Sequence, residues 1–390
     1  MIELNSQQID AVRKGKKWFH KLHKQIFEIS GFAGTGKSTI VDIIIQECGL
    51  ELHEVLFTAF VGKAAMILAM KGLPAKTIHA TFYDCIDVPK KDNDGNTILI
   101  DGRIIYTKKF VKKKQLPPEI KLIVIDEASM VNEQLKKDIL SFNIPVIALG
   151  DLHQLPPVFG DAVFLVKPDV VLTEIMRQKA DNPIIYLANK ARLGEPITAG
   201  NYKGKCLVCR KNELLKYTSI LKNSNVIICG KNATRDELNR YVRSEVFDIH
   251  SEELIIGDKL ICRQNNWNES LGENIYLING MMGYVENIDL EKFDGRSMNI
   301  DFRPEFMEDK MFTDIVMDYK YFKLPHGMRK SYVSFFNKFE LGYAITCHLS
   351  QGSQYDKVTV FNEHIGDSEF HKKWLYTAIT RAIDKLVLAF

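Results

Sequence analysis

The segment that most constrains this chain is a glycine-rich stretch near its N-terminus. It reads Gly31-Phe32-Ala33-Gly34-Thr35-Gly36-Lys37-Ser38 and matches the pattern G-x-x-x-x-G-K-[ST]. The apolar residues before it, 26–30, predict a strand, and those after it, 39–45, predict a helix. Glycines let the backbone turn tightly enough for its N–H groups to face phosphate oxygens, and the helix N-terminus adds positive charge. The stretch therefore predicts a P-loop that binds a nucleoside triphosphate.

The residue types of this loop predict separate tasks. Lys37 is expected to reach the β- and γ-phosphates, and the Ser38 hydroxyl is expected to ligate Mg²⁺. The expected nucleotide contacts are Gly34, Thr35, Gly36, Lys37, Ser38 and Thr39. What the hydrolysis drives has to be read from the rest of the chain.

Composition sets outer bounds on the answer. A chain of 390 residues is too long for one ordinary core, so at least two domains are expected. No apolar run approaches the ~20 residues of a membrane span, and the N-terminus has no signal-peptide pattern. The seven scattered cysteines suit reduced thiols in a cytoplasm-like compartment. The lone pair Cys206 and Cys209 favours two thiols on a strand over a metal site, and the net charge of +3 neither demands nor excludes nucleic acid.

Short apolar runs alternate with helix-like sequence along the chain. This alternation predicts the α/β class, with parallel sheets whose ligands bind at the carboxyl ends of the strands. In the first half the expected strands are 26–30, 54–58, 122–126 and 146–150. In the second half we expect strands at 225–229, 357–361 and 385–389, and helices at 233–244 and 374–381. The pattern predicts two sheet-based domains in tandem, with no internal repeat at a fixed period.

Two segments interrupt this rhythm. Residues 82–118 contain the turn signals Asp94-Gly95 and Asp101-Gly102, which predict a β-hairpin. Residues 256–336 are rich in strand patterns and turns and predict a small β-rich insertion in the second domain.

Polar residues come directly after the third and fourth expected strands. The run Ile123-Val124-Ile125 ends in Asp126 and Glu127, of which Asp126 can hold Mg²⁺ and Glu127 can orient and deprotonate a water. Gln154 comes after the next strand, and its amide can donate to a γ-phosphate and accept from water. A polar turn that ends at a proline is an equally good reading of Gln154.

The motifs together resemble those of superfamily 1 helicases, and most closely the RecD- and Dda-like branch, superfamily 1B. The resemblance covers nearly the whole chain, and its compact size is similar to a phage-type minimal helicase. The motifs occur in the family's order: Leu4-Asn5-Ser6-Gln7-Gln8, the P-loop, Thr58 to Ala65, Thr77-Ile78-His79, Asp126 to Ser129, Gly150-Asp151 with Gln154 to Pro157, Met176-Arg177-Gln178, Tyr343 to Gly352, and Tyr376 to Ala382.

This resemblance implies two tandem RecA-like domains that close on ATP and Mg²⁺. It implies a first domain of residues 1–81 and 119–170 with a pin at 82–118, and a second domain of 171–255 and 337–390 with an SH3-like insertion at 256–336. Gln8 would read the adenine, Gly352 would contact the nucleotide, and Arg177 and Arg381 would reach the γ-phosphate. A surface salt bridge is the alternative for either arginine.

The resemblance also implies a track for one nucleic-acid strand. Its expected contacts are Thr58, Phe60, Lys63, Thr77, His79, Thr346, His348 and Ser350, with the pin aromatics Tyr106 and Phe110. A structural histidine is the alternative for His79 and His348, and a solvated charged loop is the alternative for the pin. Leu349 departs from the lysine that the family commonly has at this position. Phe60 stands where relatives carry proline or asparagine, and the wedge is open among Tyr106, Phe110 and Phe82.

The function expected from the resemblance is an ATP-dependent DNA helicase that moves 5′ to 3′. Alternatives are a translocase that displaces proteins but unwinds poorly, an ATP-gated nucleic-acid binding switch, and a small-molecule kinase. The intact hydrolytic set disfavours the switch, and the second domain disfavours the kinase. The expected partners are single-stranded DNA and single-strand/duplex junctions, with replication or single-strand-binding proteins as candidates. The expected state is a monomer in a bacterial or phage-infected host cytoplasm.

Overall fold

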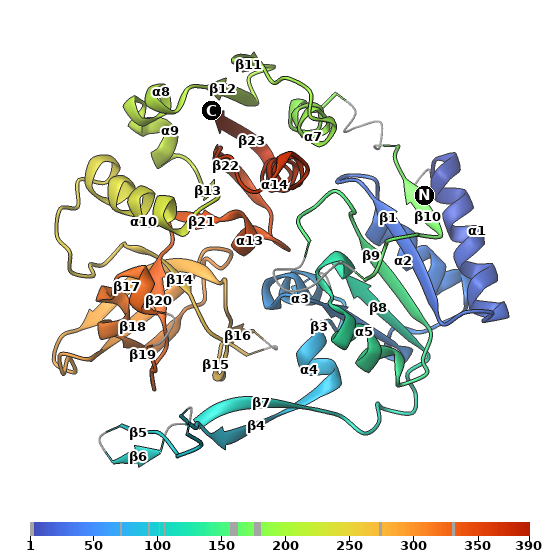
Figure 1. The fold of residues 1–390 in the computed structure, drawn as a ribbon, viewed down its shortest axis with the longest axis horizontal. Coiled ribbons are helices and arrows are strands. Elements are labelled where there is room, and N and C mark those ends of the chain that lie inside the picture. Colours follow the sequence, from blue (N-terminus) through green and yellow to red (C-terminus); the bar gives the residue numbers. More distant parts are fainter. Residues whose placement is uncertain are drawn as a thin grey trace. The chain divides into compact units, whose positions relative to one another are not determined.

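A computed structural model of the chain describes residues 4–70, 72–92, 94–100, 102–104, 106–156, 163–174, 181–272, 275–329 and 332–390. The chain forms two compact units, each of which holds one large sheet with helices packed on it (Figure 1). The first unit comprises Met1–Leu152 and Pro156–Met176, and the second comprises His153–Leu155 and Arg177–Phe390.

The first unit is built on a parallel six-stranded sheet in the order β10-β1-β9-β8-β2-β3. Its strands are β1 (Ile26–Gly31), β2 (Val55–Ala59), β3 (Lys76–Thr77), β8 (Leu122–Asp126), β9 (Val146–Gly150) and β10 (Val170–Leu172). Its helices are α1 (Ser6–Lys21), α2 (Lys37–Glu47), α3 (Gly62–Met70), α4 (Ile78–Phe82) and α5 (Glu133–Leu140), with 3₁₀ turns at Leu52–Glu54 and Ala128–Met130. The sheet thus continues to Leu172, past the boundary predicted at residue 170.

Side-chain alternation along β8 explains why helices cover both faces of this sheet. Leu122 and Val124 pack with residues of α1 and α2, whereas Ile123 and Ile125 pack with residues of α4 and α5. Because successive strand residues point to opposite faces, a strand without polar residues needs an apolar cover on each side.

The second unit contains another six-stranded sheet, in the order β11-β12-β23-β22-β13-β21. Strand β11 is antiparallel to β12, and the other pairs are parallel. The strands are β11 (Gly200–Tyr202), β12 (Cys206–Cys209), β13 (Val226–Cys229), β21 (Ala344–Thr346), β22 (Tyr355–Phe361) and β23 (Ala382–Ala389). The helices are α7 (Pro183–Leu193), α8 (Lys211–Lys216), α9 (Thr218–Lys222), α10 (Asn232–Tyr241), which continues as a π-turn at Val242–Val246, α13 (Cys347–Ser350) and α14 (Ser368–Ile379).

The two sheets repeat one strand order. In chain order the matching strands are β1, β2, β3, β8 and β9 in the first sheet, and β12, β13, β21, β22 and β23 in the second. In both sheets the first strand lies beside the fifth, and the fourth, the second and the third come next in turn. The repeat is one of topology, and insertions at different points of each copy hide it from a search for a fixed sequence period.

The first insertion is a long antiparallel ribbon in the first unit. Strand β4 (Tyr83–Pro89) pairs with β7 (Tyr106–Lys112) along its whole length. The short strands β5 (Leu99–Ile100) and β6 (Arg103–Ile104) pair beyond it. The predicted hairpin is therefore confirmed, although its main ladder lies outside the Asp94–Gly102 turn region that signalled it.

The second insertion is an antiparallel sheet in the order β19-β18-β17-β14-β20. Its strands are β14 (Lys259–Cys262), β17 (Met282–Asp289), β18 (Ser297–Pro304), β19 (Phe312–Asp318) and β20 (Phe339–Leu341), with a hairpin of β15 (Asn266–Ser270) and β16 (Tyr276–Leu277) and the short helices α11 (Tyr319–Lys323) and α12 (His326–Arg329). The β-rich character is confirmed, and the sheet extends to Leu341, beyond the predicted limit of residue 336. Its likeness to an SH3 barrel stays a prediction.

Within the described ranges, no helix combines the length and apolar character that a membrane span requires.

Candidate functional site

The glycine-rich loop lies where the sequence predicts it, between β1 and α2. Gly34 and Gly36 have φ angles of 84° and 82°, a backbone conformation that side chains strain. A Cβ atom on Gly31 would lie 2.6 Å from the Thr35 hydroxyl, and one on Gly36 would lie 2.7 Å from the Gln8 amide nitrogen. The loop is thus folded tightly enough to require its glycines.

Two polar side chains hold this loop in place. The Lys37 Nζ donates to the carbonyls of Gly31 at 2.7 Å and Phe32 at 3.2 Å, so its ammonium lies over the loop. The buried Gln8 amide donates to the Thr35 carbonyl at 2.9 Å and accepts from the Asn5 N–H at 3.0 Å. Gln8 therefore ties the start of α1 to the loop, and its reading of adenine stays a prediction.

The acidic pair lies at the end of β8. Glu127 has a φ of 53°, unusual for a residue with a side chain, and its N–H donates to the Asp126 carboxylate at 2.9 Å. Backbone strain of this kind costs about 1–3 kcal/mol and is concentrated at functional sites. The carboxylate of Asp126 and the hydroxyl of Ser38 are hard oxygen donors, which is the ligand type that Mg²⁺ prefers. The residues present therefore fit the expected metal.

The segment after β9 belongs to the second unit. The Leu155 N–H donates to the Thr377 hydroxyl at 3.0 Å, and the Gln351 amide donates to the Leu155 carbonyl at 3.1 Å. Gln154 lies next to these anchored groups and is 7% exposed, and its side-chain oxygen has no hydrogen-bond partner within the described residues. A buried amide oxygen without a donor is costly, so Gln154 is better suited to a ligand than to a plain turn.

Arg381 lies just beyond α14 and is 3% exposed. Its guanidinium donates to the carbonyls of Thr377 at 3.0 Å and Ser353 at 3.1 Å, and to the Thr380 hydroxyl at 3.2 Å. The described residues offer it no carboxylate partner, which removes the surface-salt-bridge alternative. Gly352, in the neighbouring motif, has a φ of 70°. Arg177 and Pro157 lie outside the described residues.

The third strands of the two sheets end in matching Thr-x-His corners. Thr77 ends β3 as the N-cap of α4, and Thr346 ends β21 as the N-cap of α13. His79 and His348 come two residues later, and burial lowers the pKa of both imidazoles. Both rings are therefore neutral at neutral pH and can donate and accept hydrogen bonds.

Aromatic neighbours hold the two imidazoles in place. The His79 ring lies 4.9 Å from the Phe110 ring and 5.6 Å from the Tyr83 ring, and the His348 ring lies 6.4 Å from the Phe370 ring. A purely structural histidine would have its ring nitrogens satisfied by hydrogen bonds. In the described part of the chain neither ring has such a partner, which favours a contact with a ligand.

Two other residues that the sequence predicts to contact the nucleic acid have side chains that point inward. The hydroxyls of Thr58 and Ser350 are fully buried and donate to the carbonyls of Val124 at 2.9 Å and Cys347 at 2.7 Å. Both hydroxyls therefore stabilise the fold, and neither can contact a nucleic-acid strand in this conformation. Phe60 packs against the core beneath α4 and α5, and Lys63 lies half-buried in the first turn of α3.

The three candidate wedge residues differ in their exposure to solvent. Phe82 is fully buried and packs 5.6 Å from Phe142, so it belongs to the core. Tyr106 and Phe110 are 56% and 48% exposed on β7. Phe110 is engaged with His79, which leaves Tyr106 as the exposed aromatic at the end of the β4–β7 ladder.

Nothing in the sequence predicts one set of hydrogen bonds, those accepted by Glu363. The Glu363 carboxylate, after β22, accepts from the N–H groups of Gly230 at 2.7 Å and Lys231 at 3.0 Å, and from the Thr234 hydroxyl at 2.6 Å. It thereby caps the start of α10. A lone glutamate after a strand gives no sequence signal for a bond that spans more than 120 residues.

A P-loop and an acidic pair on the first of two sheets with the same strand order define a P-loop protein of tandem RecA-like type. The family described as AAA domain matches residues 3–207, which is more than half of the 390 residues, and the UvrD-like helicase C-terminal domain matches 341–389. The chain belongs to the AAA domain family, and within it to the RecD/Pif1-like helicases of superfamily 1B.

Individual relatives agree with this assignment. The chain is 25% identical to the ATP-dependent RecD2 DNA helicase of Deinococcus radiodurans over 93% of its length, but it spans only 46% of that protein. It is also 25% identical to the ATP-dependent DNA helicase Pif1 of Campylobacter jejuni, over 91% of this chain and 86% of the relative.

A structure of two coordinating Pif1 helicases at forked duplex DNA superposes with a TM-score of 0.58 at 18% identity, over 99% of this chain and 92% of the other. This likeness confirms the expected α/β fold with tandem RecA-like domains.

Proposed function

We propose that this chain is an ATP-dependent DNA helicase that moves 5′ to 3′ along a single strand. The observation that carries the proposal is the repeated sheet: both copies keep a Thr-x-His corner, and the first adds a P-loop and the Asp126-Glu127 pair. A small-molecule kinase does not need a second sheet of the same strand order with its own Thr-x-His corner. A motor needs two bodies that hold a strand in turn, with one nucleotide site to time them.

In the proposed reaction each residue has one task. The P-loop amides and Lys37 bind the phosphates, and Ser38 and Asp126 would hold Mg²⁺, which adds positive charge there. Glu127 orients the attacking water and accepts its proton, and the Gln154 amide senses the γ-phosphate. Arg381, together with Arg177, stabilises the charge that develops on the γ-phosphate.

The proposed contacts with the nucleic-acid strand leave out hydroxyls that are fully buried and bonded to backbone carbonyls. Thr77 and His79 in the first unit, and Thr346 and His348 in the second, are the corners that we propose to contact the backbone. Thr58 and Ser350 are left out because their hydroxyls are buried. We propose the β4–β7 ribbon as the pin, with Tyr106 as its wedge, because an exposed aromatic can stack on a base.

The descriptions of the relatives support DNA as the proposed substrate. Two are described as ATP-dependent DNA helicases, and the Pif1 helicase of Bacteroides was solved bound to ssDNA and with ADP-AlF3. Direction rests on the resemblance to superfamily 1B alone.

Matched duplexes with a 5′ or a 3′ single-stranded tail, made of DNA or RNA, test the proposal. We expect unwinding of the 5′-tailed DNA, little unwinding of the 3′-tailed one, and strong stimulation of ATP turnover by single-stranded DNA. Tyr106→Ala should lower unwinding while it leaves DNA-stimulated ATP turnover intact. Preference for the 3′ tail would refute the direction, and ATP turnover that ignores DNA would refute the motor.

A further inference from the structure

A pocket of about 600 Å³ lies within the second unit. Its walls come from α10, the π-turn at 242–246, α11, α12 and β20, so it joins the RecA-like sheet to the β-rich insertion. Pockets of this size commonly hold small ligands.

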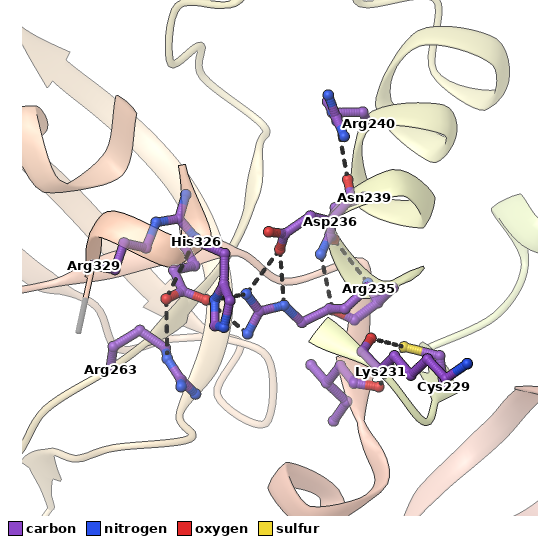
Figure 2. A network of polar contacts seen from close by, with 12 residues as sticks. Cys229, Lys231, Arg235, Asp236, Asn239, Arg240, Arg263, His326 and Arg329 are labelled. Atoms are coloured by element: carbon purple, nitrogen blue, oxygen red, sulfur yellow. Dashed lines mark hydrogen bonds and ion pairs between the residues drawn. The ribbon is translucent and has the colours of Figure 1, made fainter. Parts of the chain in front are cut away.

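Three arginines meet at one carboxylate beside this pocket. Arg235 from α10, Arg263 after β14 and Arg329 from α12 all form ion pairs with Glu340 of β20, at 3.0, 3.4 and 3.4 Å. Figure 2 shows Arg235, Arg263 and Arg329 approaching the same place from different elements. Burial alone would raise the pKa of Glu340, but the charges of Arg263, Arg235 and Arg329 outweigh that effect and hold it below its usual value.

Glu340 does not make well-formed hydrogen bonds with these arginines: its Oε2 lies 3.0 Å from Arg235 Nη1 but, among the described residues, has no hydrogen-bond donor. Its Oε1 accepts from the Tyr321 hydroxyl at 2.7 Å, and this same oxygen is the one that Arg263 and Arg329 approach only to 3.4 Å. Well-made charge-assisted bonds are about 2.7–2.9 Å long, so both pairs are incomplete. Among the described residues, Arg263 Nε and Nη1, Arg329 Nε and Arg235 Nη1 are buried without a hydrogen-bond acceptor.

The other charges around the pocket do not relieve this surplus. Asp236 is occupied by Arg235, which donates to it at 3.0 and 2.8 Å. Asp258 is occupied by Arg243 at 2.8 and 2.9 Å. Lys323 pairs with Glu253 at 3.2 Å and with Glu252, an acidic residue of the pocket wall, at 3.8 Å, so that positive charge is matched.

One further arginine and one histidine line the same pocket. Arg240 reaches the backbone carbonyl of Asp236 at 3.3 Å and has no carboxylate partner within the described residues. The His326 Nδ1 accepts from the Arg235 Nη2 at 3.1 Å, because a guanidinium nitrogen only donates, so the unmatched charge here is that of Arg240. Unmatched positive charge next to an open cavity is the arrangement that an anion completes.

We propose that this pocket binds a phosphate-type oxyanion, with Arg329 as its main ligand and Arg240 as a second. Of the three arginines around Glu340 only Arg329 lines the pocket, and an oxyanion there would give it an acceptor that Glu340 does not provide. The source is either a phosphodiester group of a bound strand or a free phosphate. The proposal does not depend on helicase activity, since the pocket belongs to the second unit alone.

Calorimetric titration of the full chain with pyrophosphate tests the site. The titration uses a Lys37→Ala background, which removes the P-loop lysine from phosphate binding. We expect saturable binding that Arg329→Gln weakens by about tenfold or more, the value of one charge-assisted bond of roughly 1.5–3 kcal/mol. Arg329→Lys should retain part of it because the charge remains.

The matched control is Arg303→Gln, an arginine of the same insertion that pairs with Glu286 and does not line the pocket. It should leave binding unchanged. No saturable binding in the Lys37→Ala chain, or equal binding in its Arg329→Gln form, overturns the proposal. Thermal unfolding of each variant separates a lost ligand from a lost fold.

Binding of a short single-stranded oligonucleotide at several salt concentrations identifies the source. If the strand supplies the phosphate, Arg329→Gln lowers the salt slope by about 0.7, the value of one backbone contact. If free phosphate is the ligand, pyrophosphate binding falls while the slope is unchanged. Both results support the oxyanion site, whereas loss of strand affinity with unaltered pyrophosphate binding contradicts it.

Discussion

The two sheets share a strand order but differ in the segments that connect their first strands to the next helix. After β1 the chain enters the glycine loop, where Gly34 and Gly36 adopt positive φ angles. After β12 it enters α8, a six-residue helix at whose start the Arg210 N–H donates to the Glu213 carboxylate at 3.1 Å, and residues 205–229 contain no glycine. A loop without glycine cannot wrap its amides around a phosphate.

The third strands, in contrast, end alike. Thr77 and His79 in the first sheet match Thr346 and His348 in the second, both threonines are N-caps, and burial lowers the pKa of both histidines. Nucleotide chemistry thus has one copy in the chain, while the proposed strand contact has two. This division is what a stepping mechanism requires. Substitutions made in one sheet at a time can test it.

The largest expected effect is a difference in ATP turnover between substitutions made after the first strand of each sheet, β1 and β12. Lys37→Ala should reduce DNA-stimulated ATP turnover to background, because no other side chain of the loop supplies a mobile positive charge to the phosphates. Lys211→Ala, after β12, should leave turnover within about twofold, as expected of a surface residue. Steady-state ATPase assays measure both, and a comparable loss in the two variants would remove the asymmetry between the sheets.

Arg381→Ala should produce the next largest effect. We expect ATP turnover to fall by about 10³-fold with nucleotide affinity nearly unchanged, as for arginines that act on the transition state. Single-turnover hydrolysis and nucleotide titration separate the two quantities. Since Arg381 makes three hydrogen bonds in its own unit, thermal unfolding must show that the variant stays folded. Unaltered turnover would return this residue to a structural role.

The matching corners should show smaller and similar effects. His79→Ala and His348→Ala should each weaken single-strand binding by ~1 kcal/mol, roughly fivefold, the value of one hydrogen bond. Fluorescence anisotropy with a labelled oligonucleotide measures both affinities. His20→Ala on α1 is a control that should change nothing. An effect confined to one corner would show that only one sheet contacts the strand.

The smallest effect is a pH dependence of stability. Both corner histidines have folded-state pKa values below the ordinary value, so the unfolded chain binds more protons than the folded one as pH falls through that range. The free energy of unfolding should therefore decrease below about pH 6.5. His79→Gln with His348→Gln should flatten this decrease in urea titrations between about pH 5 and 7.5. An unchanged slope would mean that the two rings are not buried as neutral groups.

The sequence predicts the parts of the fold that rest on local pattern. Strands β8 and β9 lie within the predicted residues because uninterrupted apolar runs can be buried on both faces. It could not show that the Thr58 hydroxyl points inward, because a buried strand such as β2 has no polar face to set the direction. The bonds of Glu340 with Arg235 and of Glu363 with Gly230 join residues more than 100 apart, and no period in the chain announces them.

The carboxylate of Glu363 has a consequence for which ligands the second unit can accept. Two backbone N–H groups and a threonine hydroxyl at the start of a helix are the donors that a terminal phosphate would use. Here they are occupied by a group that is covalently part of the chain and that no dilution or washing can remove. A free phosphate can use the amides at this helix start only by displacing the Glu363 carboxylate. Selectivity of the second unit for anions must come from its side chains.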